Sequence, residues 1–381
     1  MLRSVVKSAL AYTLSRSGAA GMVRSSNGWR SVPLVLGYHR VVEDFTRESR
    51  YSIPAMLISS RMLEKHLDWL GQHYQFVSMR EACSRLTSRE PFPRPSAVVT
   101  FDDGYQDFHQ NAMPLLNRKG IPAAVFVVTS LVGTDKPQIH DELYLLLATA
   151  RFLWRKPSEE FAALLSTIGI RTQEPLDFQS LFSRNAFALT GKLLDLLCGS
   201  DIQRIVQALE AGLPGRIFEP EGLRPLSWQM LKDMRQKEFE IGSHTATHAL
   251  LTNESMVKVL QELKSSRLEL EAGLGDKVPY FSYPDGRFHS QVVSAVKSCG
   301  YAFAFSTCTH RDPEYPLLTI PRKVLWEKSC VNPFGSFDPA VMECQITHLF
   351  DFMSPCAKNH RLPAVSSELR NVLANVRLEG N

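Results

Sequence analysis

Short apolar runs alternate with longer amphipathic segments along much of the chain. The apolar runs have the length and residue types of buried strands and lie at residues 32–38, around Val98 and Val99, and at 76–78, 121–129, 239–242, 279–283, 301–306 and 317–325. Between them, helical periodicity covers residues 61–73, 79–86, 111–119, 228–235, 256–274 and 290–299. Strands and helices that alternate at this spacing are typical of βαβ units. The pattern therefore predicts an α/β fold with a parallel sheet.

The middle of the chain has a different pattern. Between about residues 135 and 225 the strand-like runs disappear, and Leu-rich helical periods cover 141–152, 159–166, 178–198 and 202–211. We interpret residues 136–224 as a helical insertion into one domain formed by residues 31–135 and 225–330. Ser227 is a suitable N-cap for the helix that follows the insertion. Residues 331–381 read as a weakly helical C-terminal tail.

The N-terminal 30 residues fit three interpretations. Arg3 and Lys7 precede a short apolar patch at residues 9–14, which Arg16 then interrupts. This pattern is compatible with a signal peptide, with an amphipathic helix on a membrane surface, or with a loosely docked tail. A cytoplasmic, a membrane-peripheral and an exported protein therefore all stay open. No apolar run approaches the length that crosses a bilayer.

Composition narrows the class of protein. The 381 residues are 44% hydrophobic and 22% charged, which are ordinary values for a globular protein. The net charge of +4 is small for this length, and there is no long Lys/Arg block, so we expect no nucleic-acid partner. The seven cysteines are odd in number and form no CxxC pair, which argues against a disulfide framework or an all-cysteine zinc site.

Two strands end in residues that carry chemistry. Asp102 and Asp103 follow the run at Val98, and His244 and His248 follow the strand predicted at 239–242. Each pair alone fits an ordinary turn or a core position. Because the carboxyl ends of parallel strands share one edge of a sheet, the two pairs are expected to lie together. The spacing of the histidines would place both imidazoles on one side of a single turn. One carboxylate and two imidazoles make an open site for a divalent cation.

The motifs around these residues are recognisable. Thr100–Tyr105 matches the pattern TFDDG(Y/F), and Ser243–His248 matches SHTxxH. Two further elements, Leu36–Arg40 and Pro321-Arg322, fit the same subgroup. Over residues 33–131 and 226–325 the sequence resembles the polysaccharide deacetylase family, whose shared part is the NodB homology domain of carbohydrate esterase family 4. The resemblance implies a distorted (β/α)7-type barrel.

The resemblance also implies an activity, namely a metal-dependent hydrolase that removes N-acetyl groups from an N-acetylated glycan or glycolipid. Asp102 would be the general base, and Asp103, His244 and His248 would hold the metal, Zn²⁺ in the first place, with Co²⁺ or Ni²⁺ as alternatives. The metal and the backbone N–H of Asp285 would stabilise the oxyanion. Four residues are further expected to bind substrate: Tyr38, Tyr105, Tyr283 and Arg322.

Two departures from the family pattern keep alternatives open. Ser282 stands where the third motif commonly has an arginine that steers the base, and Arg287 or Arg322 would have to supply that charge. No Leu-x-His element supplies the general acid, so His39 is the first substitute and His310 the second. The competing hypotheses are a hydrolase of another non-peptide C–N bond and a catalytically impaired, glycan-binding homologue.

Overall fold

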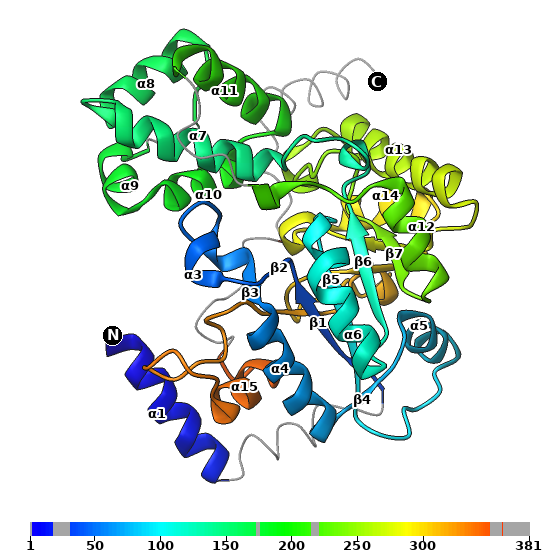
Figure 1. Ribbon diagram of the computed structural model, residues 1–381. Coiled ribbons are helices and arrows are strands. Elements are labelled where there is room, and N and C mark those ends of the chain that lie inside the picture. The colour runs from blue at the N-terminus through cyan, green and yellow to red at the C-terminus, as the bar shows by residue number, and fades with distance from the viewer. Residues whose placement is uncertain (1, 18–30, 173–175, 215–220, 351–359, 361–381) are drawn as a thin grey trace, which may run out of the picture.

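A parallel sheet occupies the centre of the computed structural model, which describes residues 2–17, 31–172, 176–214, 221–350 and 360 (Figure 1). The strand order is β10-β1-β5-β6-β7-β8-β9, and β4 pairs with the start of β5. A parallel bridge between Phe305 and Ile320 joins the two ends of this path, so the sheet curls into a barrel. The predicted seven-stranded barrel is confirmed. The strands are β1 (Leu34–Tyr38), β4 (Gln75–Phe76), β5 (Ser96–Phe101), β6 (Ala123–Val127), β7 (Glu240–Ser243), β8 (Tyr280–Ser282), β9 (Phe303–Phe305) and β10 (Lys323–Val324).

Two features of the strands differ from the prediction. The strand expected over residues 317–325 contributes only β10, because a short turn at Pro316–Leu318 precedes it. A second, two-stranded sheet pairs β2 (Arg40–Val42) with β3 (Leu57–Ser59), and the sequence pattern did not indicate it. Strands of two or three residues are too short to show an alternating pattern.

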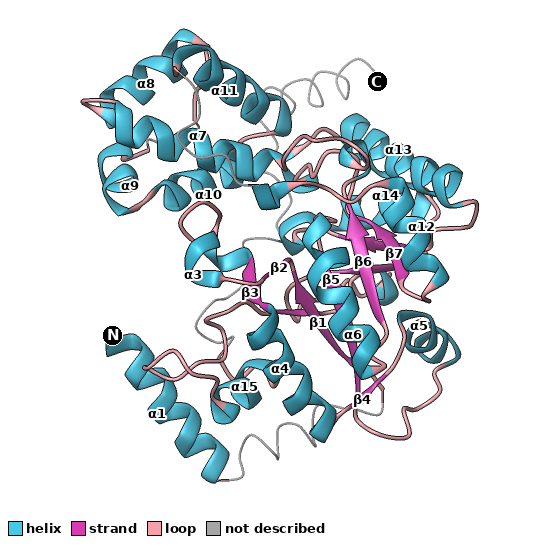
Figure 2. Ribbon diagram, viewed as in Figure 1, coloured by secondary structure: helices cyan, strands magenta, loops and turns pink. Residues whose placement is uncertain are grey.

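Helices surround the sheet (Figure 2). Serine N-caps begin α4, α5, α12 and α13, and Ser227 accepts a hydrogen bond from the Met230 N–H as predicted. The helices around the barrel are α3 (Phe45–Glu48), α4 (Ser60–His73), α5 (Met79–Ser88), α6 (Met113–Lys119), α12 (Trp228–Gln236), α13 (Met256–Leu274) and α14 (Ser290–Ser298).

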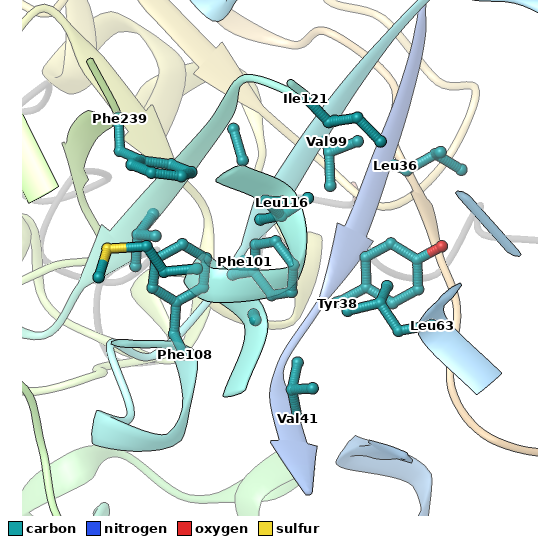
Figure 3. Close-up of a cluster of buried hydrophobic side chains, with 14 of the residues drawn as sticks. Leu36, Tyr38, Val41, Leu63, Val99, Phe101, Phe108, Leu116, Ile121 and Phe239 are labelled. Carbon is teal, nitrogen blue, oxygen red and sulfur yellow. The ribbon is translucent and has the colours of Figure 1, made fainter. Parts of the chain in front are cut away.

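The alternation of side chains along each strand builds two cores. Val35, Val98 and Phe126 belong to a cluster to which strands from around the barrel contribute. This cluster forms the interior of the barrel. Their neighbours along the strands, such as Val99 and Phe101, pack outward against α4, α6 and α12 (Figure 3). Successive side chains of a strand point to opposite faces. On β5 the inward series is Val98, Thr100 and then Asp102, which delivers Asp102 to the mouth of the barrel.

The α-helices between β6 and α12 form a lobe with a core of its own (Figure 1). Its helices are α7 (Ile139–Leu153), α8 (Pro157–Thr167), α9 (Phe178–Arg184), α10 (Ala186–Leu196) and α11 (Gly199–Gly212). The helical periodicity predicted over 178–198 corresponds to two helices, α9 and α10, divided at Asn185. Asn185 takes an extended conformation there, and its side chain caps α10 by accepting from the Ala188 N–H. The bounds proposed for the insertion and its domain stay a prediction.

The N-terminal helix packs on a helix from the C-terminal part of the chain (Figure 1). In α1 (Leu2–Arg16), Ala11 packs with Val341 of α15 (Pro339–Ile346), and Lys7 donates to the Ser329 carbonyl. Its outer face leaves Val6 57% exposed. Among the described helices, none is long and apolar enough to cross a membrane. Membrane contact therefore stays a prediction, and residues 18–30, 351–359 and 361–381 of the two predicted tails lie outside the described residues.

Candidate metal centre and catalytic base

The candidate residues gather at the carboxyl edge of the sheet, as predicted. Asp102 and Asp103 follow the end of β5, and His244 follows β7. His39 follows β1 in the same way. In parallel barrels this edge carries the functional groups, because loops of variable sequence leave it.

Asp103, His244 and His248 form a donor set that fits a divalent cation. One ligand atom from each lies within 4.8 Å of the others, and Asp103 Oδ1 is 3.5 Å from Nε2 of His244 and 3.2 Å from Nε2 of His248. Ligands that each lie about 2.0–2.2 Å from one cation are spaced in this way. Both oxygens of Asp103 are buried, and neither accepts a hydrogen bond from a described residue. A bare buried carboxylate is costly unless a cation balances it.

The tautomer of His244 suits a ligand. Its Nδ1 lies 2.8 Å from the carbonyl oxygen of Ser282, which can only accept a hydrogen bond, so Nδ1 carries the proton. The lone pair of Nε2 then faces Asp103. Such an outer hydrogen bond is usual for metal-binding histidines. Burial lowers the pKa of His244 to about 4, which keeps the ring neutral.

A bent loop, and not the expected helical turn, brings His248 beside His244. Residues 244–250, directly after β7, form no helix, and Thr245 and His248 have φ values of 69° and 60°. The two ring centroids lie 5.0 Å apart. The left-handed backbone thus replaces the helical i, i+4 geometry that was expected from the spacing of the two histidines.

The turn after β5 is also left-handed. Asp103 has a φ of 70° and Gly104 of 71°. A Cβ at Gly104 would meet Val127 Cγ1 at 2.8 Å, so only glycine lets this turn approach β6 so closely.

Charges within the site hold the two carboxyl groups ionised. Burial alone would raise the pKa of Asp102, but the charge of Arg322 and its hydrogen bonds lower it below its usual value. Burial would likewise raise the pKa of Asp103, but the contact with His248, together with His140 and His39, lowers it. The same contact raises the pKa of His248 against the effect of its own burial.

Arg322 forms a bidentate ion pair with Asp102. Nη1 donates to Oδ1 at 2.8 Å and Nη2 to Oδ2 at 2.6 Å, while Nη2 also reaches the Ser282 hydroxyl at 2.7 Å. The guanidinium carbon lies 5.3 Å from the centre of the Phe126 ring. Arg322 therefore supplies the charge that Ser282 lacks. Its assignment to substrate binding is wrong, because the residue is 1% exposed inside the barrel.

The three tyrosines expected to bind substrate are buried structural groups. Tyr38 packs in the outer core, where its hydroxyl lies 3.3 Å from His66 Nδ1 (Figure 3). The Tyr283 hydroxyl donates to the Leu318 carbonyl at 2.9 Å. Tyr105 is 1% exposed, and its hydroxyl is engaged by other side chains. Because all three hydroxyls have partners inside the protein, these assignments are corrected.

The remaining candidates lie around the site. The Nδ1 atom of His39 is buried without a partner among the described residues, and His39 is among the groups that lower the pKa of Asp102 and Asp103. Asp285 lies near enough to His248 to raise its pKa. Its side chain pairs with Arg287 at 2.7 Å, so Arg287 is engaged away from Asp102. His310 is exposed and stacks on another imidazole, with ring centroids 4.3 Å apart. The placement favours His39 over His310.

Glu262 of α13 holds the loop between the two histidines. It is fully buried, and Oε2 accepts the backbone N–H groups of Ala246 and Thr247, both at 2.9 Å. Oε1 takes the Thr247 hydroxyl at 2.9 Å and Lys258 Nζ at 2.7 Å. In the sequence, Glu262 is simply an acidic residue one helical turn after Lys258, and this spacing does not indicate that it holds the loop.

Glu262→Gln is expected to weaken cation binding and to lower the free energy of unfolding by about 1–3 kcal/mol, because a buried hydrogen-bond network loses its charge. Zn²⁺ titration and chemical denaturation measure the two effects. Glu271→Gln on the same helix is the matched control, since Glu271 binds Arg267 and the Val278 N–H. Equal Zn²⁺ affinity in the two variants would contradict the role of Glu262.

Comparison with known proteins finds a matching family. The family model described as polysaccharide deacetylase matches residues 89–144 and 190–304. A poly-beta-1,6-N-acetyl-D-glucosamine N-deacetylase of Staphylococcus aureus (strain MSSA476) is 30% identical over 110 residues, which cover 27% of this chain and 38% of that protein. The matched part thus spans less than two thirds of that relative.

Among solved structures, the Streptococcus pyogenes deacetylase PplD in complex with acetate superposes with a TM-score of 0.51. The alignment covers 83% of this chain and 97% of that one at 16% identity, which speaks to the fold alone. This chain carries a domain of the polysaccharide deacetylase family, with the (β/α) barrel of that family. The family is one of hydrolases that act on C–N bonds of N-acetylated sugars.

Proposed function

We propose that the protein is a metal-dependent hydrolase that removes N-acetyl groups from an N-acetylated glycan. The observation that carries the proposal is the pairing of Asp102, held ionised by Arg322, with the bare carboxylate of Asp103 between two imidazoles. One carboxylate is thereby free to act as a base while the other is free to hold a cation. The relative named as a poly-beta-1,6-N-acetyl-D-glucosamine N-deacetylase supports a glucosamine polymer as substrate.

Asp103, His244 and His248 would hold the cation, Zn²⁺ by the nitrogen and oxygen character of the donors. When bound, such a cation supplies Lewis acidity, which polarises a carbonyl and makes water more acidic. Asp102 accepts the proton of the attacking water, and Arg322 keeps its carboxylate ionised and aligned. The backbone N–H of Asp285 donates to the oxyanion. His39 gives a proton to the departing amine, so one water and one amide yield acetate and an amine.

Acetate release from a panel of substrates tests this proposal. The panel holds β-1,6- and β-1,4-linked N-acetylglucosamine oligomers and small amides, each incubated with the Zn²⁺-loaded chain. We expect acetate from a glycan and little product from small amides. Turnover of small amides alone would favour a hydrolase of another C–N bond. No product from any substrate by a cation-loaded chain would favour a glycan-binding homologue.

A further inference from the structure

The turn that carries Asp103 is held by the first turn of α7, which belongs to the helical lobe. Gln138 Nε2 donates to the Asp103 carbonyl oxygen at 2.7 Å. The Tyr105 hydroxyl donates to Asp141 Oδ2 at 2.6 Å and lies 2.9 Å from His140 Nε2. All five residues are at most 4% exposed. We call Gln138, His140 and Asp141 the α7 clamp.

The segment that leaves the helical lobe also contacts this turn. The Leu226 N–H donates to the Gly104 carbonyl at 2.8 Å, and the Gln106 N–H donates to the Arg224 carbonyl at 2.8 Å. Tyr105 forms an antiparallel bridge with Pro225. The backbone around Asp103 is therefore fixed where the chain enters the lobe and again where it leaves.

Hydrogen-bond chemistry assigns the protons in the clamp. Asp141, as a carboxylate, can only accept, so the Tyr105 hydroxyl donates to it. The Tyr105 oxygen must then accept from His140, whose Nε2 carries the proton. The Asp103 carbonyl can also only accept, which fixes the amide orientation of Gln138. Each bond in the clamp thus has one donor and one acceptor.

The clamp matters because the direction of the Asp103 carboxylate depends on the conformation of its backbone. Neither of its oxygens accepts a hydrogen bond from a described residue, so no such bond can hold the side chain if the backbone changes. That backbone is left-handed, which is unfavourable for a non-glycine residue and persists only where its surroundings fix it. His140 Nε2 also lies 4.0 Å from Asp103 Oδ2, and its ring centroid is 4.7 Å from that of His248.

We infer that the α7 clamp is a positioning element of the metal centre: through Gln138 and Tyr105 it holds Asp103 in the conformation that points its carboxylate at His244 and His248. The inference rests on the proposed metal-dependent function. It makes the lobe, which also has a core of its own, a part of the metal site.

Tyr105→Phe tests the clamp, because it removes the hydroxyl and both of its bonds while keeping the ring. Loss of such outer contacts typically lowers metal affinity about 10- to 100-fold. We expect a loss of this size in Zn²⁺ affinity, measured by competition with a chromophoric chelator, and a changed visible spectrum of the Co²⁺-loaded variant. Excess Zn²⁺ should restore kcat. Tyr38→Phe, which removes another buried tyrosine hydroxyl at His66, is the matched control and should bind Zn²⁺ as the wild type does.

Gln138→Met is the second variant, and it applies even if Tyr105→Phe fails to fold. It keeps the length of the side chain, removes the donor to the Asp103 carbonyl, and should also weaken Zn²⁺ binding. If the wild type binds Zn²⁺ and a folded clamp variant binds it equally well, the clamp is wrong and the proposed function stands. If the wild-type chain binds no Zn²⁺, the proposed metal-dependent function is wrong, and so is the positioning role inferred for the α7 clamp.

Discussion

Asp102→Asn is expected to lower the rate of acetate release by about 10²- to 10⁴-fold while the cation still binds. The amide keeps the shape of the side chain but cannot take a proton from water. Asp103, His244 and His248 are unchanged, so Zn²⁺ affinity should stay near that of the wild type. Acetate release at saturating glycan and Zn²⁺ content per chain are the two measurements. A folded, Zn²⁺-loaded variant with near wild-type turnover would contradict the role of Asp102 as base.

The stability of this variant needs its own control, because it leaves the buried guanidinium of Arg322 without a counter-charge. Breaking one side of a buried ion pair costs about 3–5 kcal/mol, whereas replacing both sides is often neutral. Asp102→Asn combined with Arg322→Met should therefore unfold at a higher denaturant concentration than Asp102→Asn alone. It should remain inactive, which separates the loss of the base from the loss of stability.

Arg322→Met is expected to move the acid limb of the pH–rate profile to higher pH. In the wild type, Arg322 holds the pKa of Asp102 below its usual value against the opposing effect of burial. Without that charge, burial raises the pKa, and the carboxyl group is protonated over a wider range of acid pH. Because the base works only when ionised, activity at acid pH falls more than activity at alkaline pH.

Arg322→Lys is the conservative partner of this variant. Lysine keeps the positive charge but cannot form the two parallel bonds to Asp102. We expect a smaller shift of the acid limb and a loss of rate at all pH values. An acid limb in Arg322→Met that coincides with that of the wild type would show that Arg322 does not tune Asp102.

Local patterns predicted the parallel sheet and the grouping of the Asp pair with the two histidines, whereas the barrel and the choice of Asp103 as a ligand came from the resemblance to the family. Apolar runs mark the parallel strands, and the ends of β5 and β7 carry Asp103 and His244 to one edge. The bent path to His248 was not predictable, because the pattern does not show which non-glycine residues adopt positive φ values. The conclusion that the histidines meet was right, and the geometry assumed for it was wrong.

Contacts between residues far apart in the sequence could not be predicted from local patterns. Arg322 reaches Asp102 across 220 residues, and its side-chain direction depends on the closure of the barrel at Ile320. The burial of Tyr38 was within reach, because it shares its side of β1 with Leu36 in the outer core. Gln138 and His140 lie in the predicted insertion, and neither forms part of a recognisable motif.

The central claim is that one cation, held by Asp103, His244 and His248, makes this chain a deacetylase. Stepwise return of Zn²⁺ to chelator-treated protein tests it most directly, with acetate release from a β-1,6-linked N-acetylglucosamine oligomer followed at each step. The account predicts no acetate from the metal-free chain and a rise that saturates at one Zn²⁺ per chain. Acetate release that is undiminished in metal-free protein, or absent from the fully loaded chain with every N-acetylated glycan, would contradict it.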